Sequence, residues 1–237
     1  MNQISIVLLA VGLLGTSSLR LSAASAEDLI QAHLQAIGGV EAHKKHTSRV
    51  MKGTLRIPDQ GITAEITVSA KAPNKLRTEL EIPGVGKIVE GFDGKVAWSE
   101  NPFTGAGEKP ADQQAQARRQ ADFYRDVELL SRFDTWTVKG KQLVGGKSAD
   151  VLEGKSKEGG TETLYLDEAT HMLLQAKTQD DNVNATVRFA DHRLVDGIKF
   201  PFSIEVDAGP AGTFSMVVTE VKHGIELDEK LFRLSAK

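Results

Sequence analysis

The stretch Ile198-Lys199-Phe200-Pro201-Phe202-Ser203-Ile204-Glu205-Val206 decides the fold, because large apolar side chains occupy every second position over nine residues. Alternation of this length is typical of a β-strand with one dry and one wet face. Pro201 lies on the wet face and indicates an edge or a bulge. We therefore expect a protein built mainly from strands.

The same alternation extends outward from this strand to both ends of the chain. It recurs at residues 51–57, 66–70, 76–82, 172–176 and 214–218, with turn residues between the segments. Helical spacing replaces it at residues 27–37 and 110–131. About ten or eleven strands in sequential hairpins form a meander that must curl to bury its apolar face. A closed barrel and a half-barrel plugged by the helices both satisfy that requirement.

The first 26 residues have the pattern of a cleavable export signal. An apolar run from Ile4 to Leu14 is followed by the small residues Ala24-Ser25-Ala26, which a signal peptidase recognises. The run is shorter than the roughly 20 residues that span a bilayer. We predict cleavage near Ala26, a single domain over residues 27–237 and a location in the periplasm; an uncleaved anchor is the alternative.

Composition excludes several classes of function. The net charge of −3 offers no basic excess, so nucleic acid is not an expected partner. The chain has no cysteine, which excludes disulfides, thiol catalysis, cysteine-based zinc sites and lipidation at cysteine. His43 and His46 are three residues apart without an identifiable third ligand. We expect no catalytic residue, no metal and no cofactor.

Two stretches carry a resemblance to a known family. Lys71-Ala72-Pro73-Asn74-Lys75-Leu76-Arg77 and Phe92-Asp93-Gly94-Lys95-Val96-Ala97-Trp98-Ser99-Glu100-Asn101-Pro102 resemble segments of the LolA/LolB-type outer-membrane lipoprotein carriers. Residues 165–170, 196–201 and 227–232 resemble stretches of the wider group of lipoprotein-sorting proteins. The resemblance covers most of residues 27–237 in order.

The resemblance implies an incomplete antiparallel β-barrel with helices as a lid over an apolar cavity. In these carriers the cavity takes the acyl chains of lipids or lipoproteins, with no cofactor and no covalent chemistry. The resemblance thus implies that the protein acts as a chaperone in outer-membrane biogenesis. It further implies a monomer that meets inner- and outer-membrane partner proteins transiently. Ala72 stands where the carriers have an arginine that ties the lid shut, so the cargo or the lid is expected to differ.

The resemblance and the alternation together give candidate site residues. The expected cavity lining is Leu55, Ile57, Ile66, Val68, Leu80 and Trp98 in the first half of the sheet, with Phe200, Phe202 and Ile204 in the second. The expected lid is Phe123, Tyr124, Val127 and Leu130. Packing of an ordinary core is the alternative role for each of them. An envelope-stress sensor of the same fold is the alternative function, and a hydrolase is less favoured because no nucleophile–base pair is visible.

Overall fold

The computed structural model describes residues 24–156, 160–179 and 184–234. The predicted export signal lies almost wholly outside the described residues. Its last residue, Ala26, begins the first helix, which Ser25 caps by accepting a hydrogen bond from the Asp28 backbone N–H at 3.1 Å.

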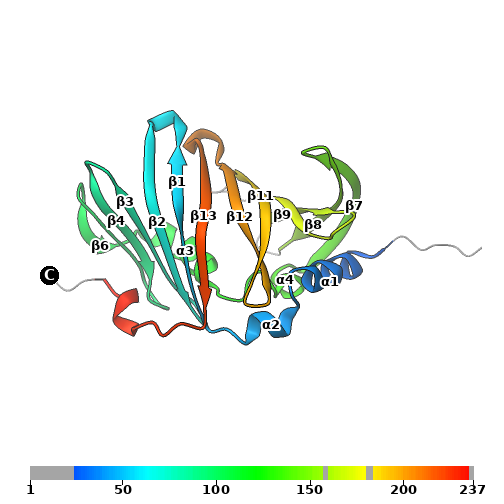
Figure 1. The fold of residues 1–237 in the computed structure, drawn as a ribbon, viewed down its shortest axis with the longest axis horizontal. Coiled ribbons are helices and arrows are strands. Elements are labelled where there is room, and N and C mark those ends of the chain that lie inside the picture. The colour runs from blue at the N-terminus through cyan, green and yellow to red at the C-terminus, as the bar shows by residue number, and fades with distance from the viewer. Residues whose placement is uncertain (1–23, 157–159, 180–183, 235–237) are drawn as a thin grey trace, which may run out of the picture.

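Thirteen strands form one sheet, with the chain running from strand to strand in hairpins (Figure 1). The strands are β1 (Ser48–Ile57), β2 (Ile62–Lys71), β3 (Lys75–Ile82), β4 (Gly86–Phe92), β5 (Ala97–Asn101), β6 (Gly105–Glu108), β7 (Thr135–Val144), β8 (Lys147–Lys155), β9 (Thr161–Asp167), β10 (Leu173–Gln179), β11 (Asn184–Val195), β12 (Ile198–Asp207) and β13 (Thr213–His223). The helices are α1 (Ala26–Ala36), α2 (Val40–Lys44), α3 (Ala111–Ala121) and α4 (Leu129–Arg132).

The sheet is antiparallel and open. Its strand order begins at β6, passes through β1 and β13 in the middle and ends at β7, so the two outermost strands do not pair with each other. The predicted fold class, an incomplete antiparallel barrel with helices, is confirmed. The strand number is thirteen rather than about ten or eleven. One strand that the sequence does not indicate is β6, whose residues Gly105 to Glu108 contain no large apolar side chain.

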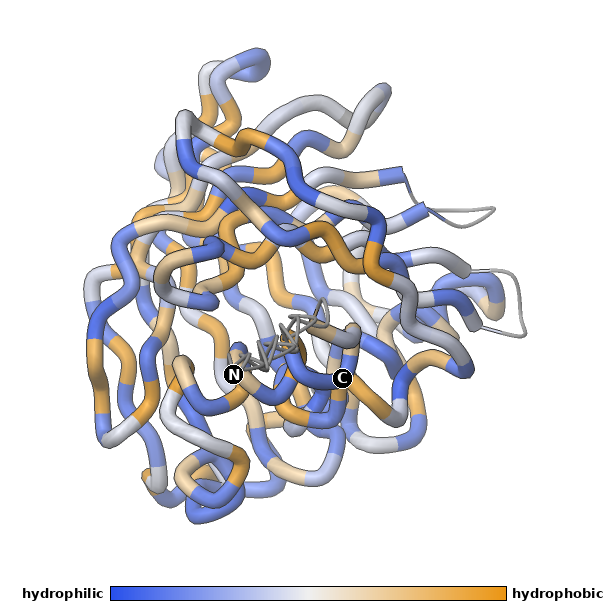
Figure 2. Tube along the Cα trace, turned by 90° about the vertical axis from the view of Figure 1, so that its right-hand side faces the viewer, coloured by the Kyte–Doolittle hydropathy of each residue, from blue (hydrophilic) through white to orange (hydrophobic). Residues whose placement is uncertain are grey.

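The helices cover one face of this curved sheet, which we call the inner face. Directly paired residues of neighbouring strands point to the same face, and the pairs Leu55↔Ala64, Ile66↔Leu80 and Leu76↔Phe92 follow that face toward β4. At that end, Ala117 and Ala121 of α3 pack on Leu76 and Phe92. Figure 2 shows the chain curling round this interior.

The other half of the inner face is covered by α1. The pairs Ile204↔Phe189, Ala176↔Leu164 and Leu164↔Leu152 carry the same face to β8. Leu29, Ile30, Leu34 and Ile37 of the α1 region pack there on Leu152, Leu164 and Leu166. Because α1 and α3 occupy the two ends, the middle strands carry no helix of their own on this face. Among the described residues, no helix has both the length and the apolar character needed to cross a membrane.

The helix predicted over residues 110–131 is wrong as one continuous element. It is divided into α3 and α4, because Asp122 has an extended backbone with φ −61° and ψ 111°. The Asp122 carboxylate accepts a hydrogen bond from the Tyr124 backbone N–H at 3.2 Å, a local contact that competes with helical hydrogen bonding. Residues 122–128 therefore form a non-helical segment, which we call the crossing segment.

Residues 225–234 lie on the outer face of β1–β5 and form what we call the C-terminal strap. Side chains that point outward donate to its backbone carbonyl oxygens: Ser48 to Ile225, Lys71 to Leu227 and Arg77 to Leu231, at 2.6, 2.9 and 3.0 Å. The strap includes a short 3₁₀ turn, Glu229–Phe232, and the Phe232 side chain is fully buried.

Candidate functional site

The middle of the inner face carries a continuous apolar surface, which we call the apolar stripe. It lies on β1, β2, β3, β12 and β13 with contributions from the β11 end. Its buried members are Leu55, Ile66, Phe202, Met216, Val218 and Val221; its half-buried members are Met51, Ile57, Val68, Leu80, Val195, Phe200, Ile204 and Phe214. Eight of the nine residues predicted to line a cavity lie in the stripe. That they bind a ligand stays a prediction.

Trp98 is the exception, and its assignment to the same lining is corrected by the strand register. Phe92 pairs with Ala97 on the inner face, so the next residue, Trp98, points to the outer face opposite Gly91. The indole is 1% exposed and lies beneath the C-terminal strap, with the Arg77 guanidinium 5.7 Å from its centroid. Trp98 therefore cannot line the stripe together with Leu80.

The four predicted lid residues lie in the crossing segment and α4 rather than on one helical face. Val127 is buried in the cluster under α1, and Tyr124 and Leu130 pack against that cluster. The Tyr124 hydroxyl donates to the His46 carbonyl oxygen at 3.1 Å, and the Phe123 backbone N–H donates to the Pro73 carbonyl oxygen at 3.0 Å. The crossing segment thus connects α3 to the helices at the other end of the sheet and is held to the chain that leads into β1 and β3.

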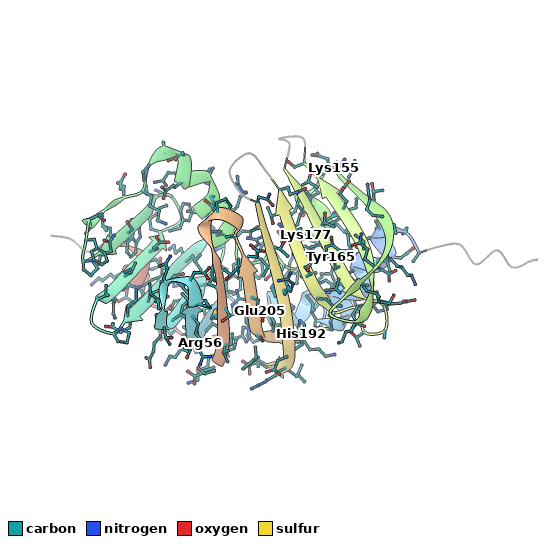
Figure 3. The ribbon with its side chains drawn as sticks, turned by 90° about the horizontal axis from the view of Figure 1, so that it is seen from above. Arg56, Lys155, Tyr165, Lys177, His192 and Glu205 are labelled. Atoms are coloured by element: carbon teal, nitrogen blue, oxygen red, sulfur yellow. The ribbon has the colours of Figure 1, made fainter. Side chains whose placement is uncertain are left out.

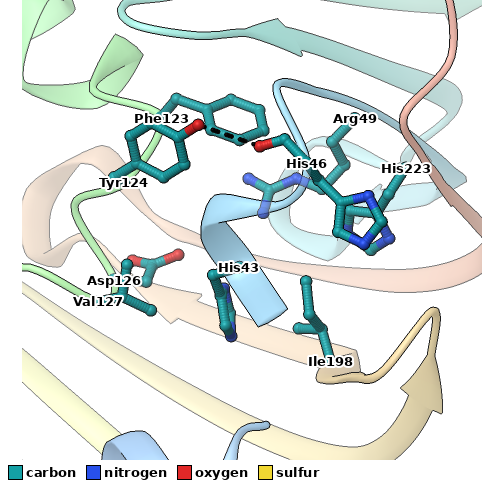
Figure 4. A pocket seen from close by; sticks show the side chains of 9 residues that line it. All are labelled: His43, His46, Arg49, Phe123, Tyr124, Asp126, Val127, Ile198 and His223. Carbon is teal, nitrogen blue, oxygen red and sulfur yellow. Dashed lines mark hydrogen bonds between the residues drawn. The ribbon is translucent and has the colours of Figure 1, made fainter. Parts of the chain in front are cut away.

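A small polar pocket lies where the apolar stripe meets the crossing segment (Figure 4). Arg49 at the start of β1 pairs in register with His223 at the end of β13, so both side chains belong to the inner face. The rings of His46 and His223 lie 5.0 Å apart between centroids. The remaining lining comes from α2, the crossing segment and β12: His43, Phe123, Tyr124, Asp126, Val127 and Ile198.

Burial shifts the titration of the cationic groups in this pocket. It lowers the pKa of the His43 and His223 imidazoles, and in His223 a contact between Nδ1 and the Asp196 carboxylate at 3.2 Å opposes the shift. Burial also lowers the pKa of the Arg49 guanidinium, against the negative charge of Asp126. Arginine stays charged at any physiological pH, so Arg49 is the fixed positive charge of the pocket.

A second depression lies at the β5–β6 edge and has a different character. Its lining includes Glu90, Ser99, Lys109 and Gln113, and it offers about 350 Å³ of space. Polar side chains of this kind do not favour an acyl chain. In the described ranges 24–156, 160–179 and 184–234, no group of three His, Cys, Asp or Glu side chains is arranged to hold a metal ion.

Sequence reasoning missed Arg49 and His223 as members of the site. Arg49 continues the alternation of Met51, Gly53 and Leu55 by one more inward position, which was a usable signal. His223 had no such signal. Its place beside Arg49 depends on a strand pairing between the two ends of the domain.

Three solved structures of bacterial proteins illustrate the likeness of this fold to known proteins. A putative outer membrane lipoprotein-sorting protein domain from Vibrio parahaemolyticus has a TM-score of 0.57 at 12% identity and covers 88% of this chain and 95% of its own. A LolA superfamily protein from Nitrosomonas europaea has a TM-score of 0.57 at 14% identity, covering 89% of this chain and 98% of its own. A DUF1329 family protein from Desulfovibrio piger has a TM-score of 0.57 at 12% identity, covering 88% and 97%.

These likenesses concern the fold. An open antiparallel sheet with helices on its inner face is the architecture of a LolA-like protein, and the described chain has that fold. The predicted LolA-like resemblance is thereby confirmed for the fold. No family model matches this chain, and no curated protein matches it by sequence.

Proposed function

We propose that this protein is a periplasmic carrier that binds the acyl chains of lipids or lipoproteins on its apolar stripe and moves them toward the outer membrane. The observation that carries the proposal is the stripe itself. Large apolar side chains such as Leu80, Phe200 and Ile204 remain partly exposed in the middle of a face whose two ends are covered by helices. A contiguous apolar surface left accessible on a folded domain is typical of a binding site.

The physical basis is transfer of apolar surface out of water. Burying one methylene group is worth about 0.8 kcal/mol, so a chain of several methylenes can be held without any specific polar contact. No bond is made or broken in such a step. The protein therefore acts on our proposal as a carrier rather than as an enzyme.

The crossing segment is the proposed lid. It lies beside the stripe, and Arg49 connects the two, because its guanidinium lies 5.7 Å from the Phe123 centroid and 5.1 Å from the Phe200 centroid. Residues 122–128 form turns rather than a regular helix, and the backbone N–H groups of Val127 and Glu128 both donate to the Tyr124 carbonyl oxygen, at 2.9 and 3.1 Å. Movement of this segment would widen access to the stripe between α3 and α1.

The cellular setting of the proposal rests on the sequence and on the fold. The export signal predicted over residues 1–26 places a single domain, residues 27–237, in the periplasm. Solved structures of the same fold include one described as a putative outer membrane lipoprotein-sorting protein domain. Loading at the inner membrane and delivery at the outer membrane then need transient partner proteins, and a monomer presents the open stripe to them.

The test measures binding of a neutral apolar fluorescent probe, N-phenyl-1-naphthylamine, to the delipidated protein. Val68 lies half-buried in the stripe, and Val217 lies 50% exposed on the outer face of β13. We expect Val68→Glu to weaken probe binding by about tenfold or more, because a carboxylate then faces the bound apolar group. The matched change Val217→Glu should leave binding unchanged.

Two results would count against the carrier. The first is a wild-type protein that binds neither the probe nor any co-purified lipid detectable by mass spectrometry. The second is equal binding by wild type and both variants, with thermal unfolding showing that all three are folded.

A further inference from the structure

The apolar stripe ends at the same edge on the two central strands, β1 and β13, and on each of them the next inward side chain is cationic or titratable. On β1 the inner face reads Leu55, Met51, Arg49, and on β13 it reads Met216, Val221, His223. From Leu55 to Arg49 the strand spans about 20 Å at roughly 3.3 Å per residue. An apolar track of this length with a positive charge at one end is complementary to an amphiphile that has one apolar chain and an anionic head group.

Arg49 is available for such a ligand. Within the described residues its guanidinium makes no ion pair and no hydrogen bond, and its neighbours are the ring faces of Phe123 and Phe200. A guanidinium presents five donors in a planar fork that matches a carboxylate or a phosphate. A charge held between two aromatic rings with its donors free is therefore a recognition group for an anion.

His223 provides the second, independent sign of a ligand. Its side chain is 2% exposed, and Nδ1 contacts Asp196. Its Nε2 is buried and has no hydrogen-bond partner among the described residues. Buried polar atoms are nearly always hydrogen-bonded, so an unpartnered nitrogen in a ring that lines the pocket indicates that a polar group belongs beside it.

The size and the negative charges of the pocket restrict the ligand. The free space is about 10 Å³, enough for one water-sized group such as a carboxylate oxygen. Asp126 lies at the rim, where its side chain is 63% exposed and 3.8 Å from the Arg125 guanidinium. Its repulsion of an anion is therefore screened by solvent and by Arg125.

We propose that this pocket binds the carboxylate of a long-chain fatty acid, with Arg49 as its principal cation, His223 as a second donor and the acyl tail along the apolar stripe. The inference rests on the proposed function, since it names the class of ligand for the same surface. Donation by Nε2 requires the His223 imidazolium, because Nδ1 faces the Asp196 carboxylate. Binding therefore takes up a proton.

The test compares head groups on one tail length. Dodecanoate, dodecanol and dodecyl phosphate displace N-phenyl-1-naphthylamine from the full chain at pH 7. We expect dodecanoate to bind at least about tenfold more tightly than dodecanol, since a hydrogen bond to a charged group contributes that much. Dodecyl phosphate should bind more weakly than dodecanoate, because its head is larger than the pocket.

Arg49→Gln should abolish the preference for dodecanoate over dodecanol. The matched control is Arg56→Gln, on the same strand but with the side chain exposed on the outer face (Figure 3). Arg49→Lys keeps the charge without the fork and should retain part of the preference. Thermal unfolding of each variant establishes that it is folded.

The pH dependence of binding gives a second readout. The charged and titratable groups that face the site are His43 on α2, His46 just before β1, Arg49 in β1, Asp126, Asp196 and His223. The preference for dodecanoate should grow from pH 8 to pH 6, and His223→Gln should flatten that growth.

Equal affinity of wild type for dodecanoate and dodecanol would overturn the inference and leave the carrier standing. Dodecyl phosphate binding as tightly as dodecanoate would overturn the carboxylate assignment, and no displacement by any of the three would overturn the carrier itself.

Discussion

The indole Nε1–H of Trp98 donates to the carbonyl oxygen of Phe232 at 2.8 Å, across 134 positions of the chain. Both side chains are buried, at 1% and 0% exposure. The bond joins β5 to the C-terminal strap on the outer face. The tryptophan of the hairpin stretch that resembles lipoprotein carriers is therefore an anchor for the strap in this protein.

Trp98→Phe should destabilise the fold by about 1–3 kcal/mol, because it leaves the buried Phe232 carbonyl without a donor. Urea unfolding measures the loss, and limited proteolysis should show faster cleavage within residues 225–234. Trp136→Phe is the matched control, since its indole donates to the Leu129 carbonyl oxygen at 3.2 Å, away from the strap. Equal cleavage of the strap in both variants would contradict the anchoring role.

Gly91→Ala should lower the free energy of unfolding by more than the addition of a single methyl group suggests. A Cβ at Gly91 would lie 2.3 Å from Cζ2 of Trp98, whose ring is fixed beneath the strap. Overpacking of this kind costs about 1–3 kcal/mol or more. At Gly107 on β6, a Cβ would meet nothing within 4 Å. Gly107→Ala should therefore leave the urea midpoint almost unchanged, and similar midpoints for the two variants would refute the steric argument.

Tyr124→Phe should speed ligand entry. It removes the hydrogen bond from the Tyr124 hydroxyl to the His46 carbonyl oxygen, one of the contacts that hold the crossing segment. The expected loss of stability is about 0.5–1.5 kcal/mol. Stopped-flow fluorescence with N-phenyl-1-naphthylamine should show a faster association rate. Tyr165→Phe, on the outer face where Lys177 lies 5.2 Å from the ring centroid (Figure 3), should keep the wild-type rate. An unchanged rate in Tyr124→Phe would argue against a lid.

His33 should make the fold sensitive to mild acid. This residue of α1 is 5% exposed, and burial lowers the pKa of its imidazole even though Nδ1 donates to the His171 carbonyl oxygen at 2.8 Å. The unfolded chain then binds the proton more readily than the folded one. The contribution of His33 is present above its unfolded pKa of about 6.5 and is lost as the pH falls through the lowered folded pKa.

The measurement is the free energy of unfolding in urea at pH 7.5, 6.5 and 5.5. Stability of the wild type should decrease along this series, and His33→Gln should show a shallower decrease because one titrating group is gone. Gln35→Ala, an exposed change on the same helix, should reproduce the wild-type slope. A His33→Gln slope as steep as that of the wild type would assign the acid sensitivity to other groups.

The strands were predictable where each had one apolar face. Residues 51–57 and 198–206 alternate cleanly because one side of each packs inside, and the structure places both in the middle of the sheet. The β6 segment could not be found in the same way, since Gly105 and Gly107 give no pattern. The end of α3 depends on a hydrogen bond from the Tyr124 N–H to Asp122, which composition does not reveal.

The face of Trp98 and the pairing of Arg49 with His223 were beyond sequence reasoning for a shared reason. Alternation assigns faces within a strand, but it does not carry across a turn. Whether Trp98 points with Leu80 or away from it depends on the pairing of Phe92 with Ala97 across the hairpin. Arg49 and His223 meet only because β1 and β13, from opposite ends of the domain, are neighbours.

Because β6 and β7 do not pair with each other, each has one side that no other strand of the described residues pairs with, which makes both ends of the sheet places where copies of the chain could aggregate. β6 offers only the four residues Gly105–Glu108. β7 is longer, but its register shifts between Val138 and Gly140, so Lys139 lies in the irregularity and Lys141 lies two residues further on. The short β6 at one end, and the irregular, lysine-bearing β7 at the other, disfavour pairing with further strands. The open sheet can therefore keep its inner face accessible without growing into a fibril.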